Sequence, residues 1–333
     1  MQFDQLKRRE FITLLGGAAA WPIAFAGPAA SQELGKVPRV GVLSPAASAA
    51  TPIFEAFRKG LQDLGYTEGK NIALDFRFAK GDVDALAPLA VELVRIPVDV
   101  IVIDATPSLR AAFDATRTIP IVMGAAGDPV LLGFAASIAR PGGNVTGMTI
   151  RGDVLSSKRL ELLKQAFPAI GSVAILANPR SPSTALALSA TKDAAGVLGM
   201  RFVSLAASVP VEVRALRPAD LSGSDALTVL PDAMFWNNRA TILALAESAR
   251  LPAIFPEREY ADDGGVIAYG PSIPDSFRRA AGYVDRILRG AKPGDLPIDE
   301  PAKFDFVVNL RTARALNFAI SPDFLSAANE VIE

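Results

Sequence analysis

The 333-residue sequence contains neither cysteine nor histidine. Without histidine it excludes Ser-His-Asp and Cys-His catalytic machinery and every imidazole metal ligand. Without cysteine it excludes thiolate chemistry, zinc ribbons, iron–sulfur centres and disulfide bonds. Much of enzyme catalysis is therefore ruled out before any motif is considered, and stability has to come from burial of the core.

An excess of charge of either sign is also missing. The chain has 34 Lys and Arg against 35 Asp and Glu, a formal net charge of -1. Because nucleic-acid binding needs an excess of basic residues to neutralise phosphates, we expect no nucleic-acid partner. Charged residues make up 21% and hydrophobic residues 50% of the chain, as in compact globular proteins. At this length, two domains of ordinary size are expected rather than one large core.

Residues 1–26 have the features of a signal peptide. Arg8 and Arg9 precede an apolar run that continues to Phe25, and Ala24 to Ala26 fits a cleavage site with small residues. The run is too short to span a bilayer comfortably. The arginine pair resembles a twin-arginine export signal, with an ordinary secretory signal as the alternative. Both interpretations predict export to the periplasm, where the cleaved protein would be soluble.

From residue 37 onward, short β-rich apolar runs alternate with longer amphipathic stretches. The expected strands are 40–43, 72–78, 98–103, 119–123, 144–150, 173–176, 202–205, 227–230, 253–255 and 266–270. The expected helices include 53–64, 83–95, 155–167, 184–198, 240–250 and 274–288. Nearly continuous apolar strands that alternate with helices are typical of parallel sheets covered on both faces. The predicted fold class is α/β, with two Rossmann-like, doubly wound parallel-sheet lobes.

Three turn-rich segments divide this pattern. They are 140–144, 262–265 and 293–301. Three crossings between the lobes predict a hinge of three segments rather than a loose linker. The predicted lobes are residues 37–147 plus 270–300, and residues 148–269 plus 301–333. A single large domain is the alternative.

Several loops after strands pair a polar residue with proline. These pairs are Thr106-Pro107, Asp128-Pro129 and Asn178-Pro179. Each fits the cap and first turn of a helix, whose exposed N–H groups suit a carboxylate or another anion. In open α/β sheets the ligand crevice lies beyond the carboxyl ends of the strands, where these loops fall. Together the loops predict a ligand crevice, although a helix cap alone would explain any one of them.

Nucleotide-binding and metal-binding motifs are missing from the sequence. There is no G-x-x-x-x-G-K-[ST], and Gly142-Gly143 and Gly264-Gly265 open strands instead of closing a strand-to-helix turn. No group of acidic residues has the spacing of a metal site. We therefore expect no cofactor and no metal.

Longer motifs follow one another in a specific order along the chain. They are 99–107 (DVIVIDATP), 119–122 (IPIV), 127–130 (GDPV), 139–147 (ARPGGNVTG), 269–270 (YG), 278–290 (RRAAGYVDRILRG) and 295–297 (DLP). In this order they resemble the ABC transporter substrate-binding family of the tryptophan/tyrosine-binding type, from about Val37 to Glu333.

The resemblance implies a type I-like periplasmic-binding-protein fold that has no catalytic activity. A small organic ligand would be held between the lobes, with an amino acid or an aromatic or carboxylate compound as the candidates. The protein would act as a monomer and deliver the ligand to an inner-membrane ABC permease and its ATPase.

Carried onto this sequence, the resemblance implies ligand-binding roles for residues at the strand ends. They are Ser44, Thr106, Ser108, Asp128, Asn178, Asp232 and Tyr269. Thr106 and Ser108 would hold a ligand carboxylate, and Asp128 or Asp232 a ligand ammonium. Thr106 and Asp128 rank highest. Asp128 is favoured because no other acidic residue is expected to open a crevice-facing helix of the first lobe.

Two other functions stay open at this point. An exported hydrolase with paired carboxylates needs neither histidine nor cysteine, and Asp128 and Asp232 are the pair to nominate. A ligand-sensing protein that presents itself to a membrane receptor is the other. A cytoplasmic sugar-responsive repressor shares the general fold, but the export signal and the lack of a basic helix-turn-helix segment argue against it.

Overall fold

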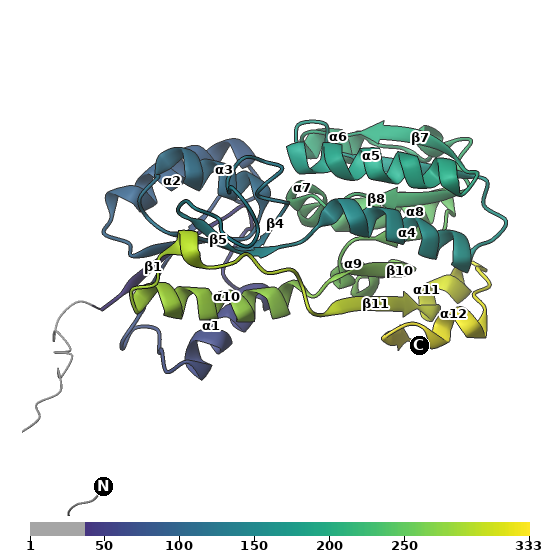
Figure 1. The fold of residues 1–333 in the computed structure, drawn as a ribbon. Helices are drawn as coiled ribbons and strands as arrows, with labels where there is room; N and C mark the ends of the chain where they lie inside the picture. The colour runs from purple at the N-terminus through teal and green to yellow at the C-terminus, as the bar shows by residue number, and fades with distance from the viewer. Residues whose placement is uncertain (1–36) are drawn as a thin grey trace, which may run out of the picture. The chain divides into compact units, whose positions relative to one another are not determined.

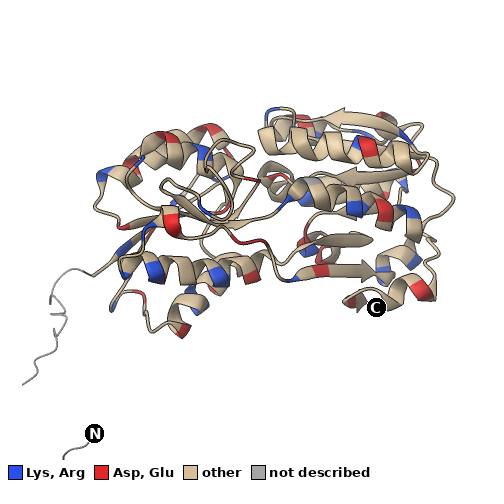
Figure 2. Cartoon of the chain, viewed as in Figure 1, with Lys and Arg blue, Asp and Glu red and all other residues tan. Residues whose placement is uncertain are grey.

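A computed structural model describes residues 37–333, which form two β-sheets, each covered by helices on both faces (Figure 1). The predicted two-lobed α/β fold is confirmed. The predicted signal peptide lies outside the described residues and stays a prediction. Between residues 37 and 333, no helix is long and apolar enough to cross a membrane. Charged residues of both signs are spread over both lobes (Figure 2).

Sheet 1 is entirely parallel. Its strand order is β2 (Ala73–Phe78), β1 (Arg39–Ser44), β3 (Val100–Ile103), β4 (Ile121–Ala126) and β5 (Val145–Thr149). One face is covered by α2 (Leu86–Arg95) and α3 (Thr106–Ala115), and the other by α1 (Pro52–Asp63) and α10 (Ile273–Leu288) (Figure 1). Strands β3, β4 and β5 are buried along their whole length, which explains their continuous apolar sequences.

Sheet 2 mixes parallel and antiparallel pairing. Its strand order is β12 (Glu330–Ile332), β11 (Phe304–Asn309), β10 (Ile267–Pro271), β9 (Ala253–Phe255), β8 (Ala226–Val229), β6 (Ser172–Ala177) and β7 (Arg201–Ala206). Its helices are α4 (Gly152–Ala166), α5 (Pro182–Val197), α6 (Pro210–Ala215), α7 (Ala233–Asn237), α8 (Arg239–Ala249), α9 (Arg258–Asp262), α11 (Leu310–Ala315) and α12 (Pro322–Ser326). Strand β11 runs antiparallel to β10, so the expectation of purely parallel sheets fails at this one pair. Short 3-10 turns are η1 (Val83–Ala85), η2 (Pro218–Leu221) and η3 (Pro293–Asp295).

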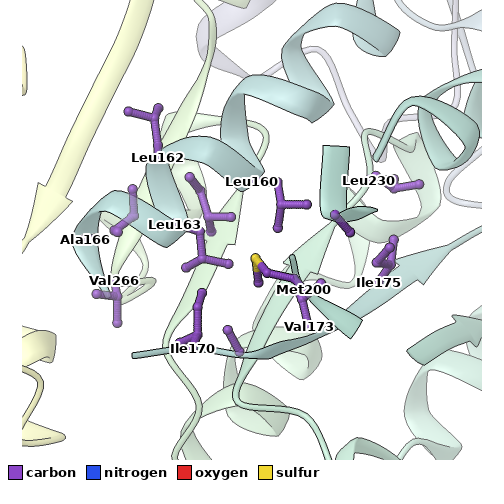
Figure 3. Packing of buried hydrophobic residues seen from close by; sticks show 14 of the residues in the cluster. Leu160, Leu162, Leu163, Ala166, Ile170, Val173, Ile175, Met200, Leu230 and Val266 are labelled. Carbon is purple, nitrogen blue, oxygen red and sulfur yellow. The ribbon is translucent and has the colours of Figure 1, made fainter. Parts of the chain in front are cut away.

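The core beneath α4 shows why this stretch folds as a helix against the sheet. Leu160 and Leu163 recur at helical spacing and are fully buried against Val173 and Ile175 of β6 (Figure 3). Alternate residues of β6 point to opposite faces, so Ala174 and Leu176 belong to the separate cluster on the other side of sheet 2.

The chain passes between the two sheets three times: from β5 to α4, from β10 to α10, and from α10 to β11. In the second passage α10 returns to sheet 1 and completes its core. The ring of Phe277 meets Phe54 and Phe57 edge to face, with centroids 5.7 Å and 6.4 Å apart. A Cβ at Gly124 of β4 would overlap the Phe277 ring, so this strand position requires glycine. The predicted lobe boundaries stay predictions, and we propose these three passages as the hinge.

Candidate ligand-binding site

A cavity of about 140 Å³ lies at the carboxyl ends of the strands of both sheets. Sheet 1 contributes the loops after β1, β3 and β4, and sheet 2 the loops after β6, β8 and β9. This is the position that parallel-sheet topology favours for a ligand. The volume accommodates about ten water-sized groups, which suits one small organic molecule.

At the sheet 1 side of the cavity, Asp104 joins two of the predicted site residues. Ser44 Oγ donates a hydrogen bond to Asp104 Oδ2, and Ser108 Oγ donates a long one, 3.5 Å, to Asp104 Oδ1. Both serines are fully buried and lie outside the cavity wall, whereas Asp104 lines it. Burial raises the pKa of Asp104 to about 7, although both hydroxyls oppose the rise. Ser44 and Ser108 therefore reach the cavity only through Asp104.

Thr106 lines the cavity at the start of α3. Its Oγ1 accepts a hydrogen bond from the N–H of Gly127 at 3.0 Å, which ties the loop after β3 to the loop after β4. The predicted helix begins here, but Ala105 occupies the cap position, so Thr106 is the first helical residue rather than the cap.

Asp128 also lines the cavity, but it does not begin a helix. Its Oδ1 accepts hydrogen bonds from the N–H groups of Val130 at 2.8 Å and Leu131 at 3.0 Å. These bonds close a turn, and Gly133, with a φ of 77°, directs the chain away from a helical path. The helix expected after Asp128 is therefore wrong, because the carboxylate stabilises a turn in its place.

On the sheet 2 side, Asn178 and Asp232 are hydrogen-bonded to each other. Asn178 Nδ2 donates to Asp232 Oδ2 at 3.0 Å, and Asp232 Oδ1 accepts the N–H of Met234 at 2.8 Å as the cap of α7. Burial raises the pKa of Asp232, and these two hydrogen bonds oppose the rise. Asp232 lines the cavity, and Asn178 holds it from an adjoining cleft.

The helix expected directly after Asn178-Pro179 begins three residues later than the proline. Asn178 Oδ1 accepts the N–H of Arg180 at 3.0 Å and forms a turn. Helix α5 begins at Pro182, with Ser181 at its cap position. The cause is the same as at Asp128, because the side chain of Asn178 also accepts a hydrogen bond from the N–H two residues ahead and forms a turn in place of a helix.

Tyr269, like Ser44 and Ser108, lines neither the cavity nor the adjoining cleft. Its ring stacks on Phe304 at a centroid distance of 6.2 Å and meets Phe306 edge to face at 5.9 Å. Its carbonyl oxygen accepts a hydrogen bond from Arg159 Nε at 2.7 Å. Tyr269 therefore packs into the core of sheet 2.

Glu257 is a cavity residue that the sequence analysis missed. It follows β9 and lines the cavity together with Glu259. Its Oε2 is shielded from solvent and has no hydrogen-bond partner within residues 37–333. Burial raises its pKa to about 8, and the charge of the buried Arg159 opposes the rise. The signal that could have found it is Pro256-Glu257 after a strand, the polar–proline pairing in reversed order.

Asp104, Trp236 and Asn237 were missed as well. Asp104 directly follows an expected strand, as the predicted site residues do, but no proline is next to it. Trp236 and Asn237 lie in the short helix α7, which Asp232 caps.

An outer cleft of about 1070 Å³ adjoins the cavity and shares Thr106, Ser181 and Asp232 with it as walls. Unlike the cavity, the outer cleft carries basic side chains. They are Lys80, Arg110, Arg180 and Arg214. Arg180 Nη2 lies 3.3 Å from Asp84 Oδ1, an ion pair that links the loop after β6 to η1.

Residues 40–332 match the family model described as ABC transporter substrate binding protein. The chain belongs to this family. The predicted family is thereby confirmed, and the family is one of solute-binding proteins rather than enzymes.

Individual relatives of this substrate-binding protein agree with the assignment. The "Tyrosine-binding protein" of Clostridioides difficile (strain R20291) is 29% identical over 264 residues, which cover 79% of this chain and 76% of the relative. A conserved domain protein of Vibrio cholerae O1 biovar eltor has a structure with a TM-score of 0.82 and 28% identity, covering 89% of this chain and 100% of that one. A Streptococcus pneumoniae ABC domain in complex with L-Trp gives a TM-score of 0.84 at 24% identity, with the same coverage, and shows the shared fold.

Proposed function

We propose that this protein is the solute-binding component of an ABC importer and captures a small organic molecule between its lobes. The observation that carries the proposal is the cavity at the strand ends, whose walls come from both sheets and carry five carboxyl groups. A ligand there would be enclosed by both lobes and presented to a membrane permease that is driven by a separate ATPase.

Amino acids are the leading ligand class, with other aromatic or carboxylate compounds as the further candidates. Support comes from the Clostridioides difficile relative, which is named for tyrosine. The cavity is largely apolar, with Ile53, Ile150, Leu186 and Trp236 in its wall, and it can enclose a hydrocarbon or aromatic side chain.

The residues have two kinds of role in this proposal. Thr106, Asp128 and Asp232 face the ligand directly, together with Asp104 and Glu257. The others position them, since Ser44 and Ser108 hold Asp104, Asn178 holds Asp232, and Tyr269 anchors Arg159 near Glu257. We further propose that the protein works in the periplasm as a monomer.

The ligand that co-purifies with the protein tests the function. We expect mass spectrometry to find one small molecule in about equimolar amount, and calorimetry to give saturable binding of the same compound to the stripped protein. A hydrolase would instead convert the compound, and its products would appear in the same spectra. Absence of any small molecule, followed by absence of binding in a thermal-shift screen of amino acids and amines, would contradict the proposed function.

A variant pair on one helix locates the binding site. Leu186 of α5 lines the cavity and is 38% exposed, so Leu186→Trp should fit locally, reduce the cavity volume and weaken binding at least about ten-fold. Val197 lies at the end of the same helix and is 88% exposed, so Val197→Trp is the matched control that should bind as the unmodified protein does.

A further inference from the structure

We propose that Gly127 determines ligand affinity by its lack of a side chain, because the lobes of sheet 1 and sheet 2 close against each other at this residue. Its partner across the lobe boundary is Ser183, in the first turn of α5. The inference rests on the proposed function and adds to it an affinity-determining residue that acts through closure of the lobes.

Away from the three chain passages, pairs of residues from opposite lobes lie against each other beside the cavity and the outer cleft. The pairs are Arg180 with Asp84, Asn237 with Pro45, and Ser183 with Gly127. They join the loops after β2, β1 and β4 to the loop after β6, the helix α7 and the start of α5. In this arrangement the lobes are therefore closed over the cavity.

Two of these pairs can separate at little cost. Asp84 and Arg180 are mostly exposed, so solvent screens their ion pair and it contributes little. The hydrogen bond from Asn237 Nδ2 to the carbonyl oxygen of Pro45 is long, 3.4 Å. Each pair includes the end of a side chain that can turn away. Neither pair therefore fixes how closely the lobes approach.

The pair of Gly127 and Ser183 differs because its atoms are fixed to the backbone. A Cβ at Gly127 would lie 2.9 Å from Ser183 Cβ, closer than two carbon atoms pack. Ser183 Cβ is attached directly to the backbone of α5, which Ala187 and Ala195 anchor in the core of sheet 2. A methyl group at residue 127 would therefore hold the lobes about 1 Å further apart.

The backbone of Gly127 does not itself require glycine. Its φ lies outside the left-handed region that glycine favours. Within its own lobe, a Cβ would lie 3.2 Å from Thr106 Oγ1 and 3.3 Å from Leu132 Cδ1, distances that a shift of a few tenths of an ångström relieves. The contact that a side chain could not avoid is therefore the one with the opposite lobe.

Closure connects this contact to affinity. A ligand in the cavity is enclosed only when the lobes meet, so its apparent affinity falls with the fraction of protein that can close. One overpacked methyl group reduces such a closed population at least about ten-fold. The open, ligand-free protein does not make the contact, so its resistance to unfolding should not depend on it.

Calorimetry on a pair of alanine variants tests the inference. The probe is the compound identified by mass spectrometry, or L-tyrosine and L-leucine where the protein purifies empty. Gly127→Ala should weaken binding at least about ten-fold and leave the melting temperature of the ligand-free protein unchanged. Gly196→Ala makes the same change near the other end of α5, where a Cβ meets nothing within 4 Å, and should bind as the unmodified protein does.

A rescue variant assigns the loss to the lobe boundary. Ser183→Gly removes the Cβ that a methyl group at residue 127 would meet, so in that background Gly127→Ala should cost little further affinity. Unchanged affinity in Gly127→Ala would overturn the inference. An equal loss in both backgrounds would also overturn it, because the clash would then lie inside the first lobe. Either result leaves the proposed function in place, whereas an unmodified protein that purifies empty and binds no probe would refute the proposed function itself.

A cross-link tests the contact without a ligand. The chain contains no cysteine, so Gly127→Cys combined with Ser183→Cys introduces a single pair of thiols. The Cβ atoms of a disulfide lie about 3.5–4.5 Å apart, so this pair should form one on oxidation when the lobes close. Gly127→Cys combined with Gly196→Cys, which is about 20 Å further along α5, should not. Absence of a disulfide in the first pair would overturn the contact.

Discussion

Asp104 and Glu257 are half-buried carboxyl groups, and they couple the stability of the ligand-free protein to pH. Their pKa values of about 7 and about 8 lie above the ordinary values of 3.8 and 4.5. Between these limits the folded protein binds more protons than the unfolded chain, so the free energy of unfolding falls as pH rises.

We therefore expect the ligand-free protein to resist urea better at about pH 5.5 than at about pH 8.5, by on the order of a few kcal/mol. Urea titrations followed by circular dichroism measure this difference. Asp104→Asn should flatten the profile, because the amide does not titrate. A stability that stays constant over this range would show that both carboxyls ionise freely in the folded state.

Asp128 lends itself to a variant that separates charge from structure. The side-chain oxygen of Asp128→Asn can still accept the N–H groups of Val130 and Leu131, so the free energy of unfolding should change by less than about 1 kcal/mol. Ligand affinity should fall less than in Glu257→Gln, because the carboxylate of Asp128 already has two donors, whereas Glu257 Oε2 has none within the described chain. A larger loss than in Glu257→Gln would make Asp128 the main partner of a ligand ammonium.

The sequence predicted the loops that line the cavity better than the individual side chains that line it. Thr106, Asp128 and Asp232 line the cavity because residues after parallel strands meet at one edge of a sheet. Ser44 contacts Asp104 because β1 lies next to β3, and Asn178 contacts Asp232 because β6 lies next to β8. Strand order is not visible in a local sequence pattern, so these contacts could not be predicted.

At the scale of elements, the contact between α1 and α10 depends on the absence of a side chain at Gly60. A Cβ at Gly60 would lie 2.9 Å from Ala281 Cβ and still closer to the carbonyl oxygen of Arg278. Gly60→Ala should therefore destabilise the protein by about 1–3 kcal/mol, although alanine is the better helix former. Thermal or urea unfolding measures the effect.

Gly282, within α10, provides the matched control. A Cβ there meets nothing within 4 Å, so Gly282→Ala should stabilise the protein by about 0.5–1 kcal/mol. Equal effects of the two substitutions would mean that the helices can separate without cost.

Most elements could be predicted because their apolar spacing reflects burial. The expected helix 53–64 is observed as Pro52–Asp63, and the expected strand 253–255 is observed with the same bounds. Neither β11 nor β12 was among the expected strands, and β12 is short and half exposed. The antiparallel direction of β11 is a second feature that apolar spacing does not encode.

At the scale of the whole molecule, three chain passages and a cavity with walls from both sheets favour closure around a ligand. The compound identified by mass spectrometry should reduce the radius of gyration of the stripped protein in small-angle scattering. At about 100 times its dissociation constant it should also stabilise the folded state by about 2.7 kcal/mol, seen as a higher melting temperature. Saturating binding with unchanged scattering would contradict two moving lobes.

The return of α10 to sheet 1 affects how the chain folds as the ribosome synthesises it. All five strands of sheet 1 have been translated once Thr149 has been added, yet Phe277 follows only after most of sheet 2 has been made. Until then, Phe54 and Phe57 lack the ring that they pack against in the finished protein. The core of the first lobe therefore stays incomplete while residues 150–276 are added, and a late part of the chain completes it.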